Sequence, residues 1–504
     1  MILFMGCMME NLLFCLIKDK ISHKLANAII NRYEPKKVFL MIDRTFASDA
    51  SICGATISQK YIYQECQNLK YWKYKYSDSS PPPDNKLLTK LLVHEPIIFK
   101  MFDRYPNETS KSTKKTLMTY DERVRAYHTH LQYWSYMLDR AKISTVVFAN
   151  APHTIVDYII YCLCLLKGID VVMSSNAFNP SFVAFHSVLT EPCPRVAYRY
   201  EKLLIKYKDT HIDNIELDSD FLNVFNNLSS QDENKTPWFM NPELAILKKR
   251  EGYIPPLIVA YNAKAVNPDF SKRYIYFPLH FQPELTTCPL GGYFVHQTLA
   301  IKMISHCLPR DMFLYVKEHP NQDAKYWGRN LSDYSDIGKL QNVSMVKQDV
   351  DTFELIKNCI AVATITGTAG FEGLFMSKPF LMFGNHTYKY ASGVYNIRTN
   401  KECREAITII ATNGAEHTLK DLKIWLKAVS KDVSFCTVHF PQLMERGILP
   451  ISEVENMNRV TSGYFRVLDE FEIKNNVRTP SVPNKNRRGK IRNFLKRLLR
   501  RSKH

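Results

Sequence analysis

The sequence lacks any hydrophobic run long enough to cross a membrane. No segment reaches the roughly 18 uninterrupted apolar residues that a bilayer-spanning helix needs. The apolar run Met1–Ile17 has no basic stretch before it and is interrupted by Glu10 and Asn11, so it matches a signal peptide poorly. The sequence therefore predicts a cytoplasmic protein.

The chain also lacks the paired cysteine spacing of zinc sites and disulfide frameworks. Its 12 cysteines are scattered, and the closest pair, Cys162 and Cys164, lies in an apolar run without a nearby histidine cluster. This spacing argues against a structural metal or a disulfide core. Many free thiols are typical of a reducing compartment, which again favours the cytoplasm.

Acidic residues are absent from the end of the chain. The segment Lys485–His504 holds ten Lys or Arg residues, so the net charge of +18 falls to +8 for the rest of the sequence. Four apolar residues recur there at helical spacing: Phe494, Leu495, Leu498 and Leu499. A basic amphipathic tail over 471–504 suits an anionic membrane surface. Nucleic-acid binding and a solvated tail are the alternatives. We expect association with the inner face of the membrane and no nucleic-acid partner.

The first half of the chain alternates strand and helix patterns. With 504 residues, 45% of them hydrophobic, the chain can form two or three packed domains. Strands are predicted at Val38–Ile42, Thr145–Phe148 and Ile169–Met173, and a helix at Thr154–Lys167. Residues 68–141 are predicted to be a mostly helical insertion. This order indicates a parallel sheet in a first domain, residues 1–251.

The second half repeats this alternation. Strands are predicted at Tyr274–Leu279, Met312–Val316 and Val343–Val346, with a helix at Tyr293–Cys307. The pattern indicates a second doubly wound domain over 252–470. The fold class is therefore α/β, with two Rossmann-like domains, a helical insertion in the first and a basic C-terminal tail.

The segment with the clearest functional pattern is Ile360–Gly384. An apolar strand ends in the turn Thr366–Gly370, and a short helix carrying Glu372 follows. Such a loop directs backbone N–H groups and the positive end of a helix at an anion. Thr366 and Thr368 add hydroxyl donors beside Gly367 and Gly370, and the Glu372 carboxylate can accept hydrogen bonds from a ribose. These residues predict a nucleotide-binding site.

The turn Lys317–Pro320 follows a buried-looking strand on the same predicted edge. Proline after His319 ends the strand and fixes the backbone, which holds the imidazole outward. His319 can donate to a phosphate oxygen and Lys317 can add positive charge. A capping or core histidine is the alternative for His319.

A polar loop follows the first strand of the second domain. In it, Gln282 suits an amide contact to a base or sugar, and Glu284 could act as an acid, a base or a nucleophile. An ordinary Pro-Glu turn is the alternative for Glu284.

In the first domain, His153 and Asp157 lie four positions apart near a predicted helix start. This spacing places both side chains on one helix face, so they could supply a proton acceptor or an attacking carboxylate. A plain N-terminal helix residue is the alternative for His153. The Asp218–Asp220 stretch resembles a D-x-D metal signature, but it precedes a helix as a cap would. No metal site is predicted.

These motifs together resemble a known family. The KEHP turn, the TITGTAGFEG loop, KPFLMFG and the FPLHFQPE loop are similar to the second domain of bacterial capsule polysaccharide synthesis proteins, the Kdo-transferase and polysialyltransferase-like group of GT-B glycosyltransferases. The resemblance implies a GT-B fold, a phosphate contact of a CMP-activated sugar at His319, a phosphate loop at Thr366–Thr368 and a Gln-Pro element at Gln282. The loop here has Thr-Gly-Thr where the family has paired serines.

The expected activity is glycosyl transfer without a metal or other cofactor. The donor would be a CMP- or NDP-sugar, the substrate rather than a cofactor, and the acceptor a surface polysaccharide or glycolipid. Two enzymatic alternatives share the architecture: a polyol-phosphate transferase of the teichoic-acid type and a nucleotide-sugar epimerase. A non-catalytic protein that binds membranes or nucleic acid is the third.

Overall fold

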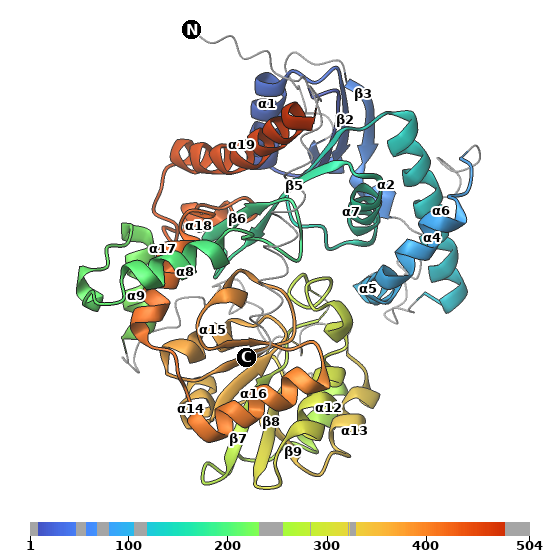
Figure 1. The fold of residues 1–504 in the computed structure, drawn as a ribbon. Coiled ribbons are helices and arrows are strands. Elements are labelled where there is room, and N and C mark those ends of the chain that lie inside the picture. Colours follow the sequence, from blue (N-terminus) through green and yellow to red (C-terminus); the bar gives the residue numbers. More distant parts are fainter. Residues whose placement is uncertain are drawn as a thin grey trace, which may run out of the picture.

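The chain folds into two α/β domains, which lie one above the other in Figure 1. A computed structural model describes residues 9–46, 57–67, 80–104, 118–230, 256–282, 284–320, 322 and 329–478. Each domain is built on one sheet, of seven strands in the first domain and six in the second. The predicted basic tail beyond residue 478 lies outside the described residues.

The first sheet has the strand order β13-β6-β5-β4-β1-β2-β3. Its strands are β1 (Asn11–Ile17), β2 (Lys37–Ile42), β3 (Ile57–Ile62), β4 (Thr145–Phe148), β5 (Asp170–Asn176), β6 (Phe182–His186) and β13 (Val433–Phe435). The strands from β5 to β3 run parallel, whereas β6 and β13 pair antiparallel. The first strand precedes the expected start at Val38, because the apolar N-terminal run contains β1 in the centre of the sheet.

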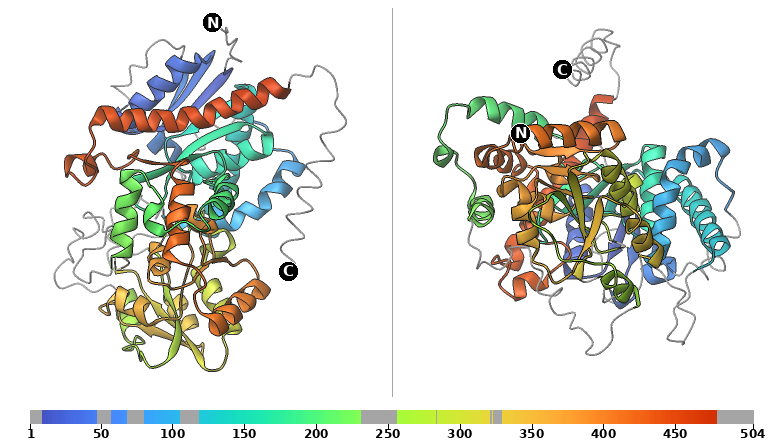
Figure 2. Two further views of the ribbon diagram at one scale, coloured as in Figure 1. Left: turned by 60° about the vertical axis from the view of Figure 1, so that its left-hand side comes forward. Right: turned by 90° about the horizontal axis from the view of Figure 1, so that it is seen from below.

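Helices cover both faces of this sheet. One face packs against α1 (Lys20–Tyr33) and α19 (Glu453–Arg478), which lie side by side in Figure 2. The other face packs against α2 (Tyr63–Gln67), α4 (Asn85–Leu91), α5 (Glu95–Met101), α6 (Tyr120–Arg140) and α7 (Ile155–Lys167). The described part of the predicted insertion, 80–104 and 118–141, is therefore mostly helical.

The second sheet is parallel throughout and has the order β12-β11-β10-β7-β8-β9. Its strands are β7 (Arg273–Pro278), β8 (Met312–Lys317), β9 (Val343–Val346), β10 (Ala361–Thr364), β11 (Phe380–Met382) and β12 (Val394–Asn396). One face is covered by α11 (Pro256–Asn262), α12 (Gln297–Cys307), α13 (Leu331–Ile337) and α16 (Asn400–Asn413). The other is covered by α14 (Thr352–Asn358) and α15 (Thr368–Phe375).

The end of the described chain returns to the first domain. After α17 (Leu419–Val429), strand β13 joins the first sheet. The short α18 (Gln442–Glu445) follows, and α19 then packs against one face of that sheet. The Tyr464 hydroxyl donates to the carbonyl oxygen of Phe148 at 2.8 Å. The predicted second domain, 252–470, therefore includes residues that belong to the first sheet.

Apolar contacts join the two domains beside their facing edges. The rings of Phe178 and Phe371 stack with centroids 5.5 Å apart, and helices α8 (Val196–Lys206) and α9 (Ser219–Ser229) belong to the same cluster. The Thr387 hydroxyl donates to the carbonyl oxygen of Ala177 at 2.9 Å. Because Thr387 follows β11 and Ala177 follows β5, the carboxyl edges of the two sheets face each other. This is the GT-B arrangement, and the predicted fold class is confirmed.

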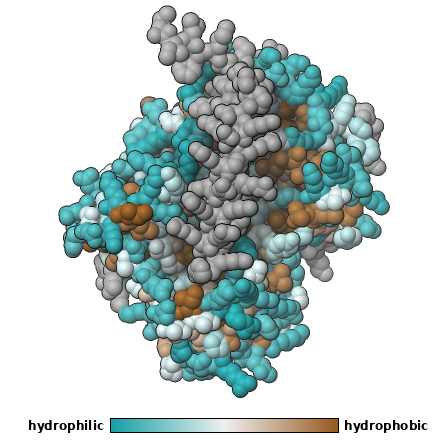
Figure 3. Space-filling view, in the orientation of Figure 1, coloured by the Kyte–Doolittle hydropathy of each residue, from teal (hydrophilic) through white to brown (hydrophobic). Residues whose placement is uncertain are grey.

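The described surface is mainly hydrophilic on the face shown in Figure 3, with scattered apolar residues. Leu92 and Val93, next to α4, are 56% and 62% exposed. Among the described helices, none combines the length and apolarity that crossing a membrane requires. The ten cysteines in the described ranges are buried free thiols.

Candidate functional site

His280 organises the carboxyl edge of the second sheet. It follows β7, and its Nε2 accepts a hydrogen bond from the backbone N–H of Thr366 at 3.1 Å. The Thr364 hydroxyl lies 2.8 Å from the same nitrogen and must donate to it, because Nε2 carries the lone pair. The ring proton of neutral His280 is therefore on Nδ1. Burial lowers the pKa of His280 to about 3, so near neutral pH the ring is an uncharged donor.

The predicted glycine loop lies directly against this ring. A side chain at Gly367 would come within 2.9 Å of Thr364 Oγ1 and 3.3 Å of His280 Cε1, so glycine allows the close approach. Gly367 is the N-cap of α15, and residues 367–369 are partly exposed. The first amides of a helix have no acceptor within the helix. They therefore offer N–H donors to an anion beside His280.

Several predicted binding groups are already used inside the protein. The Thr366 hydroxyl donates to the Thr286 carbonyl oxygen at 2.6 Å. The Lys317 ammonium donates to the Val350 carbonyl oxygen and to Thr352, and Gln282 donates to Val295. Gly370 has a packing role, since a side chain there would lie 2.4 Å from the Phe380 ring. The structure thus uses the polar groups of Thr366, Lys317 and Gln282 in contacts within the protein.

The KEHP turn is held by a buried ion pair. The Glu318 carboxylate lies 2.5 Å from Arg329 Nε and accepts the backbone N–H of His319 at 2.7 Å. Arg329 also donates to the His280 carbonyl oxygen at 2.7 Å. The Tyr334 hydroxyl donates to the other Glu318 oxygen. This network joins the end of β8 to the end of β7.

His319 and the glycine loop lie on the same edge of the sheet. The His319 ring centroid is 5.7 Å from that of Phe281. Burial and the Arg329 charge lower the pKa of His319 to about 4. The proximity of His319, Arg329 and His386 adds to the lowering of the pKa of His280 by burial. Three imidazoles therefore gather beside the start of α15.

His386, like the role of His280, was missed by sequence reasoning. Its Nδ1 is 3.1 Å from the Thr387 hydroxyl, which itself donates to Ala177 of the first domain. Nδ1 must therefore donate, which leaves Nε2 as an acceptor. The ring stacks on Tyr388 with centroids 4.2 Å apart, and burial lowers the pKa of His386 to about 3. Its position in the loop that follows β11 was a usable signal, because ligands bind at the carboxyl ends of parallel strands.

Glu372 is a buried carboxyl group on α15. It is 3% exposed, and its Oε1 has no hydrogen-bond partner among the described residues. Burial raises the pKa of Glu372 to about 8, against the opposing effect of a hydrogen bond with Thr368. Since this oxygen is closed off from solvent, the contact of Glu372 with a ribose stays a prediction.

The buried Glu372 carboxyl should make stability depend on pH. The folded protein keeps this proton up to a pH of about 8, whereas the unfolded chain loses it near 4.5. Stability should therefore fall as pH rises through this window, by up to about 1.4 kcal/mol per pH unit. Glu372→Gln stays uncharged and should gain stability relative to the wild type between pH 5 and 8, measured by urea unfolding.

The matched control for this effect is Glu354→Gln, which changes an exposed carboxyl on α14. It should leave the pH dependence of unfolding unchanged. A Glu372→Gln variant with the wild-type slope would show that this carboxyl is ionised in the folded protein.

The predicted catalytic residues occupy three different environments. His153 Nδ1 lies 2.8 Å from the Ala151 carbonyl oxygen, at the carboxyl end of β4. Asp157 is buried in the first turn of α7 and accepts the Thr154 hydroxyl at 2.6 Å. Glu284 accepts the N–H of Cys288 through its backbone oxygen at 2.7 Å. Their catalytic roles stay predictions.

A second polar group lies at the carboxyl edge of the first sheet. His439 Nε2 is 3.2 Å from the Ser174 hydroxyl, which donates to the Ala149 carbonyl oxygen. Burial lowers the pKa of His439, with smaller contributions from Lys18 and His153. Lys18, His153 and His439 follow β1, β4 and β13, so they share the carboxyl edge of the first sheet with Ser174 of β5. In the weak D-x-D match, Asp220 pairs with Arg459 at 3.0 Å, which is a structural role.

The comparisons with known proteins agree with the motif-based resemblance. Residues 291–427 match the family model described as capsule polysaccharide biosynthesis protein. The match covers the start of α15 and the KEHP turn, and the predicted resemblance to capsule polysaccharide synthesis proteins is confirmed. No curated protein matches the sequence significantly.

Among solved structures, the chain is similar to the β-Kdo 2,7-transferase and the β-Kdo 2,4-transferase of Thermosulfurimonas dismutans KpsC. The first is 12% identical, with 69% of this chain and 90% of that chain covered and a TM-score of 0.31. The second is also 12% identical, with 58% and 82% covered and a TM-score of 0.30. A UDP-GlcNAc 2-epimerase from Methanocaldococcus jannaschii is 12% identical, with 84% and 99% covered and a TM-score of 0.25.

Proposed function

We propose that the protein is a glycosyltransferase that moves a sugar from a nucleotide-activated donor to a surface polysaccharide or glycolipid. The donor is a CMP- or NDP-sugar bound at the carboxyl edge of the second sheet. The acceptor binds at the facing edge of the first sheet. The match of residues 291–427 to a capsule polysaccharide biosynthesis family supports this class of reaction.

The observation that carries the proposal is the fixed polarity of His280. Because Nε2 is occupied by Thr364 and Thr366, the Nδ1–H is the group left for a ligand. A phosphate oxygen is an acceptor and fits this donor together with the first amides of α15. The three imidazoles are uncharged near neutral pH, so in this proposal neutral hydrogen-bond donors stabilise the leaving phosphate.

His386 supplies the complementary group. Its Nε2 is an acceptor, oriented by the chain of hydrogen bonds through Thr387 to Ala177. A ligand that bridges His280 and His386 needs an acceptor at one end and a donor at the other. A glycosyl phosphate has both, since its phosphate accepts and its sugar hydroxyls donate.

In the proposed transfer, an acceptor hydroxyl oxygen forms a bond to the anomeric carbon of the donor. The bond from that carbon to the phosphate oxygen breaks, and its electron pair leaves with the nucleotide. The hydroxyl proton passes to a base on the first domain. His153 and His439 lie at the edge where such a base belongs, together with Lys18. No metal or other cofactor is required in this scheme, because the Nδ1–H of His280 and the amides of α15 offset the charge of the phosphate.

The basic C-terminal segment gives the proposed enzyme a route to its acceptor. Its ten Lys and Arg residues and its apolar residues at helical spacing suit the anionic inner face of a membrane. Peripheral attachment would bring a lipid-linked or growing glycan to the first domain.

The direct test is an assay of nucleotide released from a panel of CMP-, UDP- and GDP-sugars, with and without a polysaccharide acceptor. Acceptor-dependent release together with sugar on the acceptor supports glycosyl transfer. Phosphate retained on the acceptor would instead identify a polyol-phosphate transferase, and a rearranged sugar formed without acceptor would identify an epimerase. No binding of any nucleotide would favour a non-catalytic protein.

A further inference from the structure

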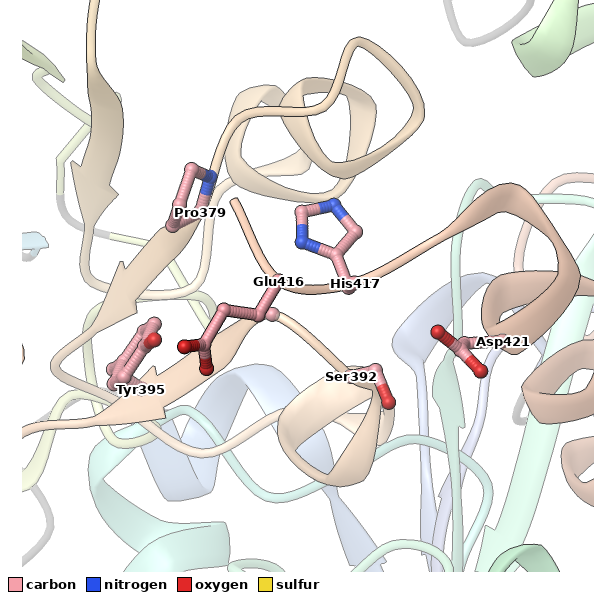
Figure 4. A pocket seen from close by; sticks show the side chains of 7 residues that line it. Pro379, Ser392, Tyr395, Glu416, His417 and Asp421 are labelled. Atoms are coloured by element: carbon pink, nitrogen blue, oxygen red, sulfur yellow. The ribbon is translucent and has the colours of Figure 1, made fainter. Parts of the chain in front are cut away.

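A small pocket lies between the starts of β11, β12 and α17, away from the carboxyl edge of the second sheet. Figure 4 shows its lining side chains, with the carboxylates of Glu416 and Asp421 on either side of the His417 ring. Ser392, Gly393, Tyr395 and Pro379 complete the wall. From these groups we infer that the pocket binds a small organic cation, a primary ammonium or a guanidinium group. This inference is independent of the proposed glycosyl transfer.

His417 gives the pocket a buried acceptor. The residue is 8% exposed, and its Nε2 lies 2.8 Å from the Leu374 carbonyl oxygen. A carbonyl oxygen only accepts, so Nε2 must donate and the neutral ring has its lone pair on Nδ1. Nδ1 has no hydrogen-bond partner among the described residues. In Figure 4 this nitrogen points towards the side of the pocket that holds Glu416.

The hydroxyl of Ser392 is also limited to accepting. The Tyr200 hydroxyl donates to the Asp421 carbonyl oxygen at 3.1 Å and lies 2.7 Å from Ser392 Oγ. Since the Tyr200 proton is used on Asp421, Ser392 must donate its own proton to Tyr200. Ser392 Oγ therefore has only lone pairs left for a ligand.

The two carboxylates add uncompensated negative charge. Glu416 Oε1 accepts from Asn413 at 2.8 Å, and Asp421 Oδ2 accepts from Thr418. The second oxygen of each carboxylate accepts no hydrogen bond from another described residue, and neither carboxylate forms an ion pair within the described part of the chain. Burial and, to a smaller extent, the Glu416 charge raise the pKa of the Tyr395 hydroxyl, so this hydroxyl keeps its proton.

The side chains of the lining therefore offer mainly acceptors and two negative charges, and the Tyr395 hydroxyl is a donor among them. A ligand that satisfies it must present several N–H donors and a positive charge, as ammonium and guanidinium groups do. A metal ion fits less well, because no three His, Cys, Asp or Glu side chains in the described ranges are placed to hold one.

The backbone around the pocket preserves space beside His417. Gly393 has a φ of +85°, and a side chain there would lie 2.3 Å from Nδ1. A residue other than glycine would therefore close the approach to this nitrogen. The Leu374 carbonyl is in the last turn of α15, whose C-terminal end carries partial negative charge. A cation bound at Nδ1 would thus be linked to α15, the helix that begins at the glycine loop, through the His417 ring.

Calorimetric titration of the full chain with agmatine, which has both an amino and a guanidino group, tests this inference. We expect one site in the wild type and binding weaker by about tenfold in Glu416→Gln, which removes a charged acceptor. The matched control is Glu405→Gln, which removes an exposed charge on α16 and should leave binding unchanged. Thermal unfolding of each variant checks that the fold is retained.

Three outcomes would overturn the inference. They are no binding at about 10 mM agmatine, equal affinity in the wild type and Glu416→Gln, and binding of Mg²⁺ at the pocket without binding of agmatine. Nucleotide binding, measured in the same samples, reports separately on the proposed function, because Glu416→Gln should not change it.

Discussion

Replacing His280 with alanine should lower the turnover of sugar transfer by about 10²-fold or more, because removal of one preorganised donor at a developing negative charge has this effect. The His280→Ala variant removes two functions of this side chain at once, so it cannot separate them. Its Nε2 anchors Thr366, and its Nδ1–H is the donor that we assign to the proposed phosphate. Turnover and nucleotide affinity are both measured, since a phosphate contact acts on each.

Two further variants separate these functions. In His280→Gln the side-chain amide can occupy the place of Nε2 and keep the bond to Thr366, but the Nδ1–H is lost. If the phosphate contact matters, this variant should be as impaired as His280→Ala. If His280 only anchors the loop, glutamine should restore activity. The exposed His306 on α12 provides the control, since His306→Ala should behave as the wild type.

Replacing Arg329 with methionine should destabilise the protein by about 3–5 kcal/mol, which is typical when one partner of a buried ion pair is removed. The side chains of Arg329 and Glu318 are 3% and 0% exposed. Methionine would leave the Glu318 carboxylate buried with Tyr334 and the His319 amide as its donors. The free energy of unfolding in urea measures this cost.

The double variant Glu318→Leu with Arg329→Met tests the cause. Removing both charges should recover part of the lost stability, because no uncompensated charge stays buried. A double variant with the summed cost of the two single variants would show that packing, not charge, is responsible. A matched surface pair, Arg273 and Asp311, is about half exposed on both sides, so Arg273→Met should change stability by at most about 1 kcal/mol.

The strand and helix pattern made much of the fold predictable. Val38–Ile42, Thr145–Phe148 and Met312–Val316 are strands as expected, because parallel strands buried on both faces are continuous apolar runs. The same property explains why β1 was not predicted, since an apolar run at the N-terminus was compared with a signal peptide rather than with a strand. The return of β13 and α19 to the first sheet depends on contacts such as Tyr464 with Phe148, more than 300 positions apart. No local pattern encodes such a contact.

The candidate site was predictable in position but not in detail. The carboxyl-edge rule brought His319 and the glycine loop to one edge, as the structure has them. Local pattern did not show that the Thr366 hydroxyl bonds to Thr286, which is 80 positions away. Sequence reasoning likewise predicted a ligand-binding loop after β7 but gave no role to its first residue, His280, because the partners of its ring are distant in sequence. The sequence alone does not distinguish a side chain that donates to a ligand from one that donates within the protein.

The most direct test is a comparison of nucleotide and nucleoside binding by calorimetry, with cytidine, CMP and CDP and with the corresponding uridine and guanosine compounds. A phosphate held by His280 and the start of α15 predicts that the preferred nucleotide binds at least about tenfold more tightly than its nucleoside. It also predicts that this advantage disappears in His280→Gln. An advantage of the same size in that variant, or no binding of any nucleotide to the wild type, would contradict a phosphate site at this edge.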